Sequence, residues 1–368
     1  MRVVSLVAGL LVAATVLWDA FETIVLPRTV SRRFRLARVF FRGTWWPWAY
    51  ISRAFGSDGR RERFLAIYGP VSLIGLLTVW AVGLVLSFAA LHWAAGSMLQ
   101  GSTPGPAAFA DDVYMSGTTF FTLGLGDLRP IGATARLLTV VESGMGLGLL
   151  ALVIAYFPVL YQSFSRREVR LTLLDSWAGS PPAAAEVLRR LAEAGELNAL
   201  ERFLTDWEYW CSDLLESHIS YPLLAFFRSQ HQRQSWVAAL TTILDLSALV
   251  SVGIDDGVSA WQAHVTFAIA RHAAVDLTQV LHAVPDDGVD RLTADGLEQL
   301  RRQLELAGLH PRRSADADAR FIELRRSYEP FVAGLGRLLV MPLPAWSRAH
   351  SLRDNWQTSS HRDGGPHL

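Results

Sequence analysis

The chain has 368 residues, of which 51% are hydrophobic and 18% are charged, and its formal net charge is zero. Soluble domains usually carry about a quarter charged residues, so this composition favours a membrane protein. The absence of net positive charge argues against a nucleic-acid-binding protein. The single cysteine, Cys211, excludes an intrachain disulfide. Because no nucleophile motif surrounds it, we expect a small packed side chain there.

Three segments are apolar and long enough to cross a bilayer as helices, which requires about 20 residues each. They cover residues 3–26, 68–93 and 133–161. The first has the position of a secretory signal, but its apolar run continues well past the short core of such a signal. A retained helix is therefore the better interpretation.

The loop between the first two spans sets the expected orientation. Residues 28–63 contain ten arginines against two acids, Asp58 and Glu62. Short loops rich in arginine stay in the cytoplasm, so we expect a multi-pass protein of the inner or plasma membrane. Its N-terminus would lie outside and everything after the third span in the cytoplasm. No span has regularly spaced arginines, which argues against a voltage sensor.

Two acids stand near the cytoplasmic end of the first span. Asp19 and Glu22 are three residues apart and share one helix face. We favour ion pairs with the arginine-rich loop, and a gating or lipid-binding role is the alternative.

The linker between the second and third spans predicts a re-entrant loop. Residues 104–121 read as a short helix, with prolines before it and with Asp111 and Asp112 in its first turn, where acids suit the helix dipole. A glycine-dense stretch follows at once. Irregular backbone at membrane depth is tolerated only where it lines water or is buried in protein.

This stretch, "TLGLGD", resembles the selectivity filter of potassium channels, usually Thr-Val-Gly-Tyr-Gly-Asp, and the order of span, pore helix, filter and span is also that of the family. In such filters backbone carbonyls replace the hydration shell of the ion, and glycines permit the positive φ angles that aim them inward. The resemblance implies ion binding by Thr122, Leu123, Gly124, Leu125, Gly126 and Asp127. It also implies a homotetramer in the lipid bilayer, because one loop supplies a quarter of a filter.

Two filter positions depart from the usual motif. Leu123 replaces valine and Leu125 replaces tyrosine, whose hydroxyl normally supports the filter from behind. We therefore expect a tetrameric, potassium-selective cation channel, with a weakly selective cation channel as the alternative. Permeant potassium is the only ligand expected, with no cofactor and no other metal.

Four residues are candidates for support of the filter. Tyr114 falls where the pore helix would face the filter and is either a hydrogen-bond partner of Asp127 or an ordinary packing residue. Glu142 lies inside the third span, where an acid is a functional candidate. We expect it to hydrogen-bond Thr118 or Thr119 behind the filter rather than to contact the ion.

Two residues of the third span are candidates for gating. Gly146 follows Gly126 by twenty residues, about where the family has its inner-helix hinge. The alternative is a glycine that lets helices pack closely. Pro158 would kink the inner end by removing a backbone hydrogen bond.

The rest of the chain reads as helical throughout, which gives the expected fold class: an all-α membrane protein with a pore-loop channel domain and a helical cytoplasmic domain. Residues 235–253 are apolar but short for a span, so we favour a core helix. We expect the histidines of the cytoplasmic domain to be ordinary helix residues, with metal or proton sensing as the alternative. They are His218, His231, His264, His272 and His282. The expected divisions are 1–63, 64–165, 166–343 and a disordered tail, 344–368.

Other classes of function are weaker. No glycine-rich nucleotide-binding motif appears, so no nucleotide site is recognised. No nucleophile, acid–base pair or metal-ligand spacing suggests an enzyme. The remaining alternative is a membrane-anchored signalling or binding protein with a degenerate pore.

Overall fold

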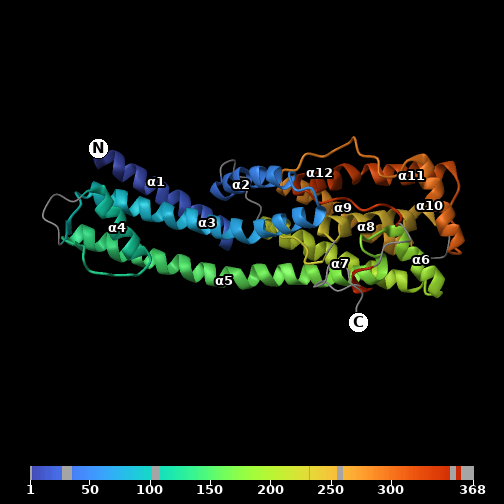
Figure 1. Ribbon diagram of the computed structural model, residues 1–368, viewed down its shortest axis with the longest axis horizontal. Helices are drawn as coiled ribbons and strands as arrows, with labels where there is room; N and C mark the ends of the chain where they lie inside the picture. The colour runs from blue at the N-terminus through green and yellow to red at the C-terminus, as the bar shows by residue number, and fades with distance from the viewer. Residues whose placement is uncertain are drawn as a thin grey trace. The chain divides into compact units, whose positions relative to one another are not determined.

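The computed structural model describes residues 2–26, 35–101, 108–231, 233–254, 260–348 and 354–357. Within these residues the fold is helical, apart from one two-stranded antiparallel ladder and an isolated bridge (Figure 1). The chain divides into two compact units, one of residues 1–50 and 67–161 and the other of residues 51–66 and 162–368. Residues 104–107, part of the arginine-rich loop and most of the tail lie outside the described residues.

Four helical segments of the described chain are long and apolar enough to cross a membrane: Arg2–Val25, Asp58–Ala94, Ala133–Ala178 and Trp236–Gly253. The first three contain the expected spans. The fourth is 83% buried within the protein, as expected for a core helix. Helix α3 (Asp58–Ala94) has 37 residues and α5 (Ala133–Ala178) has 46. At 1.5 Å per residue they measure roughly 55 and 69 Å, well beyond the ~30 Å hydrocarbon core.

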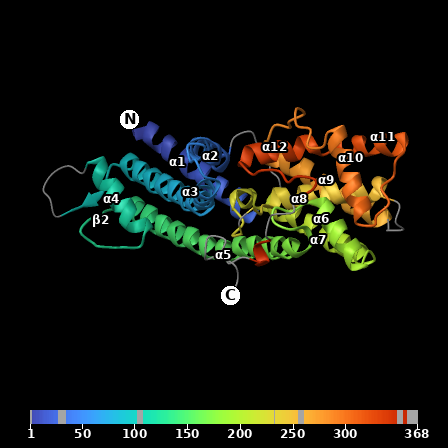
Figure 2. The same ribbon diagram turned by 45° about the vertical axis from the view of Figure 1, so that its right-hand side comes forward.

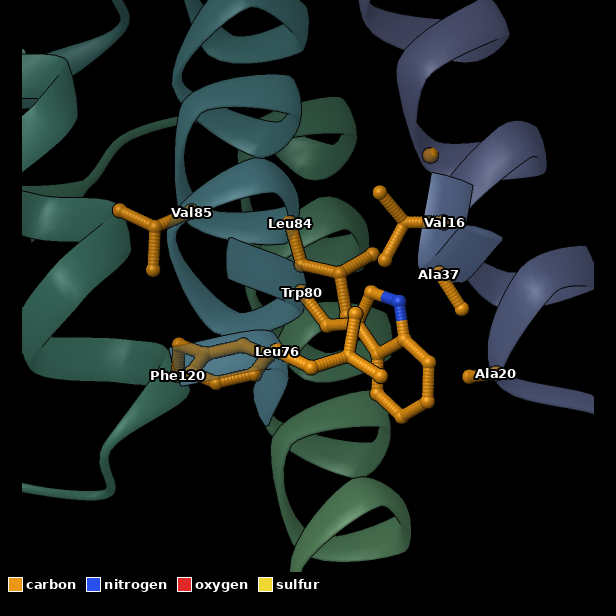
Figure 3. Packing of buried hydrophobic residues seen from close by; sticks show 9 residues of the cluster. Val16, Ala20, Ala37, Leu76, Trp80, Leu84, Val85 and Phe120 are labelled. Carbon is orange, nitrogen blue, oxygen red and sulfur yellow. The ribbon is translucent and has the colours of Figure 1, made fainter. Parts of the chain in front are cut away.

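The first unit is built around α3. Its other elements are α1 (Arg2–Ala20), which runs on into a π-helical turn at Phe21–Val25, most of α2 (Leu36–Ser52), α4 (Phe109–Phe120) and the first part of α5. Figure 3 shows its apolar core, where Trp80 and neighbouring leucines of α3 pack against Val16 and Ala20 of α1, Ala37 of α2 and Phe120 of α4. Trp80 is only 1% exposed, so this core fixes α1 and α4 on α3.

The two acids near the end of the first span have different partners. Glu22 accepts a hydrogen bond from the Trp18 indole (2.5 Å) and pairs with Arg35 (3.6 Å), which is the ion pair expected with the arginine-rich loop. Asp19 instead accepts from the backbone N–H of Ala37 (3.0 Å) and from the indole N–H of Trp80 (2.9 Å). The ion pair expected for Asp19 is therefore wrong, because its carboxylate caps the first turn of α2.

The second unit is an assembly of helices around α8 (Trp236–Ala248), which is buried at all of its positions. Its one acid, Asp245, is 0% exposed and accepts hydrogen bonds from the Tyr328 hydroxyl and the Arg291 guanidinium, both at 2.5 Å. The surrounding helices are α6 (Ala184–Ala194), α7 (Ala199–Ser220), α9 (Ala260–Val280), α10 (Ala294–Leu306), α11 (Ala315–Arg326) and α12 (Glu329–Leu339).

The C-terminal part of α5 belongs to this second unit. Its Arg167 is buried, donates to the carbonyl oxygens of Leu224 (2.9 Å) and Phe227 (2.7 Å), and contacts the Nε2 of His218 (3.2 Å). One guanidinium therefore fixes α5 to α7 and to the 3₁₀ turn Pro222–Phe226 that follows it.

The described part of the expected tail is packed rather than disordered. Trp346 is 3% exposed and its ring meets that of Phe321. Asp354 is 4% exposed and pairs with Arg190 (2.6 Å) and with Arg348. Disorder from residue 344 onward is therefore wrong for these residues. The composition of the tail, rich in arginine and glycine, suggested solvation, but its Arg348 is paired with the buried acid Asp354.

Candidate pore loop

The pore-loop candidate lies between α3 and α5. After α3 the chain forms β1 (Leu99–Gln100), then α4, then an irregular loop and β2 (Arg129–Pro130), and then enters α5. Strands β1 and β2 pair antiparallel, so the loop that contains α4 leaves and returns at one place. Figures 1 and 2 show α4 between α3 and α5. The order of apolar helix, short helix, irregular loop and apolar helix is the one that the sequence predicts.

The ends of α4 agree with its sequence. The Asp111 carboxylate accepts a hydrogen bond from the Ala108 N–H (2.8 Å) and so caps the first turn. At the other end lies the stretch that resembles a potassium-channel filter, Thr122–Asp127, here called the filter segment. It folds back onto the helix, because the N–H groups of Leu123 (2.8 Å) and Gly124 (3.3 Å) both donate to the Thr118 carbonyl. The last turn of α4 thus fixes where the filter segment begins.

The backbone of the filter segment alternates in hand. Thr122, Gly124 and Gly126 have φ angles of +57°, +54° and +75°, whereas Leu123 and Leu125 between them are not in the left-handed region. Positive φ angles therefore recur at every second residue from Thr122 to Gly126. A Cβ built on Gly124 or Gly126 would meet nothing within 4 Å, so these glycines are required by φ and not by space.

The filter segment is uncovered in the single chain. Residues 121–127 are all exposed, and the side chains of Leu123 and Leu125 are 62% and 64% accessible. Irregular backbone inside a membrane must be buried in protein or line water. Within a membrane, the exposed loop would have to line water or contact further protein.

Two of the candidate support residues, and one arginine, make polar contacts around the filter segment. Tyr114 interacts through its hydroxyl with the Asp127 carboxylate, the partner considered from the sequence. The Thr118 hydroxyl donates to the Met115 carbonyl within its own helix (3.0 Å). Arg129, which sequence reasoning did not single out, donates from Nε to the Gly126 carbonyl (3.0 Å). It places a cationic group beside the last glycine of the filter segment.

Glu142 has partners other than those expected. Its carboxyl group contacts the hydroxyl of Ser116, and His92 Nε2 lies 3.7 Å from it. The predicted hydrogen bond between Glu142 and Thr118 or Thr119 is therefore wrong. The reason is the rotation of α4: Ser116 and Thr118 are two residues apart and point to different sides of the helix. Ser116 and His92 were missed, although an ionisable side chain within a span, such as His92, is a functional candidate by position alone.

Helix α5 is continuous through both gating candidates, Gly146 and Pro158. At Gly146 the backbone of α5 lies so close to the Phe120 carbonyl that an added Cβ would overlap it. Added Cβ atoms at Gly144 and Gly148 would meet nothing within 4 Å. Of the two interpretations of Gly146, close packing has a direct contact in the structure.

The chemistry of the second unit is that of a packed interior. Cys211 is buried, and burial raises the pKa of its thiol, which keeps it in the unreactive form. His218 is buried between Arg167 and the Leu214 carbonyl. His272 pairs with Asp276 one turn along α9 (3.1 Å). Among the described residues no group of three potential ligands is arranged to hold a metal ion.

Comparison with known proteins bears on the first unit. Residues 74–162 match the sequence profile of a family described as "Ion channel", and this range holds most of α3, all of α4, the filter segment and the membrane part of α5. The chain therefore carries an ion channel domain. A relative, described as "Uncharacterized membrane protein YdjJ" of Bacillus subtilis (strain 168), is 22% identical over 255 residues, which cover 67% of this chain and 74% of the relative. No solved structure matches.

With the ion channel domain located, the chain is an all-α membrane protein, as the sequence predicts. The matched range ends at residue 162, at the point where the second unit resumes.

Proposed function

We propose that the chain is the subunit of a homotetrameric, potassium-selective channel whose filter is formed by Thr122–Asp127. The observation that carries the proposal is the alternating backbone at Thr122, Gly124 and Gly126 within a matched ion channel domain. Four such segments around an axis would offer rings of carbonyl oxygens of the kind that replace the hydration shell of potassium. Thr122 would add its hydroxyl oxygen at the inner end.

The tetramer is supported by what the single chain leaves uncovered. One chain contributes one filter segment, and its residues are exposed together with Leu137, Val140 and Leu147 of α5. A central axis lined by four copies of α5 would cover part of this apolar surface and leave the remainder to the pore. In this arrangement Gly146 and Pro158 lie on the helix that would move during gating.

The orientation proposed for the channel has the N-terminus outside and the helical second unit in the cytoplasm. It is supported by the arginine-rich loop before α3 and by Arg166, Arg167 and Arg170 soon after the apolar part of α5. We infer that the helical unit acts on the pore through α5, because this one continuous helix contributes residues to both units.

The deciding experiment is ion flux in liposomes that contain the purified chain. Under opposed potassium and sodium gradients, the reversal potential should follow the potassium gradient. Equal permeability would establish the weakly selective channel instead, because Leu125 stands where tyrosine normally supports the filter. Flux that is absent from tetramers of the intact chain would reject the channel and leave a membrane-anchored binding protein.

A further inference from the structure

Four polar side chains are buried where α3, α4 and α5 meet. His92 of α3 is 1% exposed, and Asp112 and Ser116 of α4 and Glu142 of α5 are each 0% exposed. They lie within the membrane domain, where burying an ionised group without a partner is costly. The protonation state of this cluster is therefore a property of the fold.

The hydroxyl group of Ser116 contacts two oxygen atoms that can accept a hydrogen bond. Its hydroxyl oxygen is 2.7 Å from the Val85 carbonyl and is also in hydrogen-bond contact with Glu142 Oε1. A serine hydroxyl carries one proton, and a backbone carbonyl carries none. When Ser116 donates its proton to Val85, a hydrogen bond with Glu142 needs a proton from Glu142. Both contacts are satisfied together by a neutral Glu142 carboxyl group that donates to Ser116.

Asp112 and His92, on the other side of the cluster, are incompletely paired. Asp112 accepts from the Ser97 hydroxyl (2.6 Å) through one oxygen, and its second oxygen has no partner among the described residues. His92 Nε2, at 3.7 Å from Glu142, is beyond hydrogen-bond distance, and both ring nitrogens lack partners among the described residues.

Further charged groups around the cluster lie at its edge. Asp111 of α4 caps its own helix, and from α1 the Arg2 guanidinium lies near Gly96. Two ionised carboxylates buried in one cluster repel each other, which favours a neutral form of one of them. When Glu142 is neutral, Asp112 is the one carboxyl group of the cluster that can still be ionised.

We propose that Glu142 of α5, Ser116 of α4 and His92 of α3 form a proton-binding site that joins these three helices, with the proton on Glu142. The site rests on the proposed function only for its effect on conduction, since α4 carries the filter segment. When Glu142 loses the proton, Ser116 has one hydrogen for two acceptors, Val85 and the carboxylate. One of the two bonds that hold α4 is then lost, and the carboxylate turns to His92. Alkaline conditions therefore loosen α4.

The proton itself is observable by infrared spectroscopy, whether or not the channel conducts. The full chain is reconstituted in liposomes, and the C=O absorbance of protonated carboxyl groups is recorded from about pH 5 to about pH 9. Absorbance present at neutral pH should disappear in Glu142→Gln and persist in the matched variant Asp112→Asn. An unchanged protonated-carboxyl absorbance in Glu142→Gln at neutral pH would overturn the site.

A second variant keeps the test decisive if Glu142→Gln does not assemble. Ser116→Ala retains the acid but removes its acceptor, so the Glu142 absorbance should shift in frequency. An absorbance at the wild-type frequency would overturn the proposal.

Potassium flux provides the functional readout. Glu142→Gln has no carboxyl proton to lose, so its potassium flux should change less between neutral and alkaline pH than the flux of wild type does. A wild-type decline that persists in Glu142→Gln would reject the functional part of the proposal. Loss of flux in wild type with the infrared result intact would reject the channel and leave the proton site standing.

Discussion

Gly146 of α5 lies directly against the backbone carbonyl of Phe120, the last residue of α4. Phe120 lies two positions before Thr122, so main-chain atoms of α4 contact α5 close to the start of the proposed filter. A glycine is needed at this position because any Cβ would overlap the carbonyl. Gly146 therefore has a packing role that is distinct from any role in bending α5.

Alanine substitution separates the two roles. We expect Gly146→Ala to displace Phe120 and to cost about 1–3 kcal/mol through overpacking. The strain falls next to Thr122, so the ratio of potassium to sodium permeability should fall together with total flux. Liposome flux under both cations measures the ratio directly.

Gly144→Ala and Gly148→Ala are matched controls, because each stiffens the same helix by a similar amount but meets open space. Both should keep the permeability ratio of wild type. If Gly146→Ala lowers flux with the ratio unchanged, the contact with Phe120 does not position the filter, and a hinge is the better interpretation.

Gly124→Ala tests the filter backbone. Gly124 has φ +54° with free space around it, so an added methyl group strains the backbone without creating a clash in the chain. The left-handed conformation costs a non-glycine residue roughly 1–2 kcal/mol, and four copies multiply the effect in one filter. We expect potassium flux to be lost while the tetramer survives on size-exclusion chromatography. Gly43→Ala, also in open space but in the interior of α2, should leave flux unchanged.

The sequence predicted the membrane domain well because its signals are local. Apolar length indicated the spans, Asp111 indicated the start of α4, and the glycine spacing indicated the positive φ angles at Gly124 and Gly126. Each of these depends on a residue and its near neighbours in the chain.

What the sequence did not reveal depends on residues far apart. Nothing local shows that Glu142 meets Ser116, 26 positions away, or that Asp19 meets Trp80, 61 positions away. Ser116 and Thr118 both offer a hydroxyl group, and the packing of α4 decides which of them faces Glu142. Trp346 and Asp354 were missed for the same reason, since their partners lie in distant helices.

Asp19→Ala should destabilise the first unit. The carboxylate satisfies the N–H of Ala37 and the indole N–H of Trp80, and both would stay buried without a partner. Each unsatisfied donor costs about 1–3 kcal/mol. We expect a lower thermal unfolding midpoint in detergent and weaker protection of the α2 amides from hydrogen exchange. Asp58→Ala removes an acid that is 92% exposed, and it should leave both measurements as in wild type.

Folding should hide the Cys211 thiol from alkylation. The side chain is fully buried in α7, and burial raises the pKa of its thiol. In mass spectra after brief treatment with iodoacetamide, the folded chain should stay unmodified, whereas the chain in denaturant should gain one adduct. Rapid modification of the folded chain would show that α7 opens locally and would contradict the packing around Cys211.

His218 should make the helical unit less stable in acid. Burial and the positive charge of Arg167 lower the pKa of His218 well below its ordinary value of 6.5. Its Nε2 accepts from Arg167 and its Nδ1 donates to the Leu214 carbonyl, so a second ring proton would face a guanidinium. The folded state therefore keeps the ring neutral, whereas the unfolded chain binds a proton once the pH falls below about 6.5.

The stabilisation due to His218 is accordingly complete above that pH and is lost progressively below it, by at most about 1.4 kcal/mol per pH unit. The thermal unfolding midpoint, measured from about pH 8 to about pH 5, should fall more steeply in wild type than in His218→Gln, which has a donor and an acceptor but no titration. His272→Gln, at an exposed ring on α9, should keep the wild-type slope. Equal slopes in wild type and His218→Gln would mean that the ring is protonated in the folded unit.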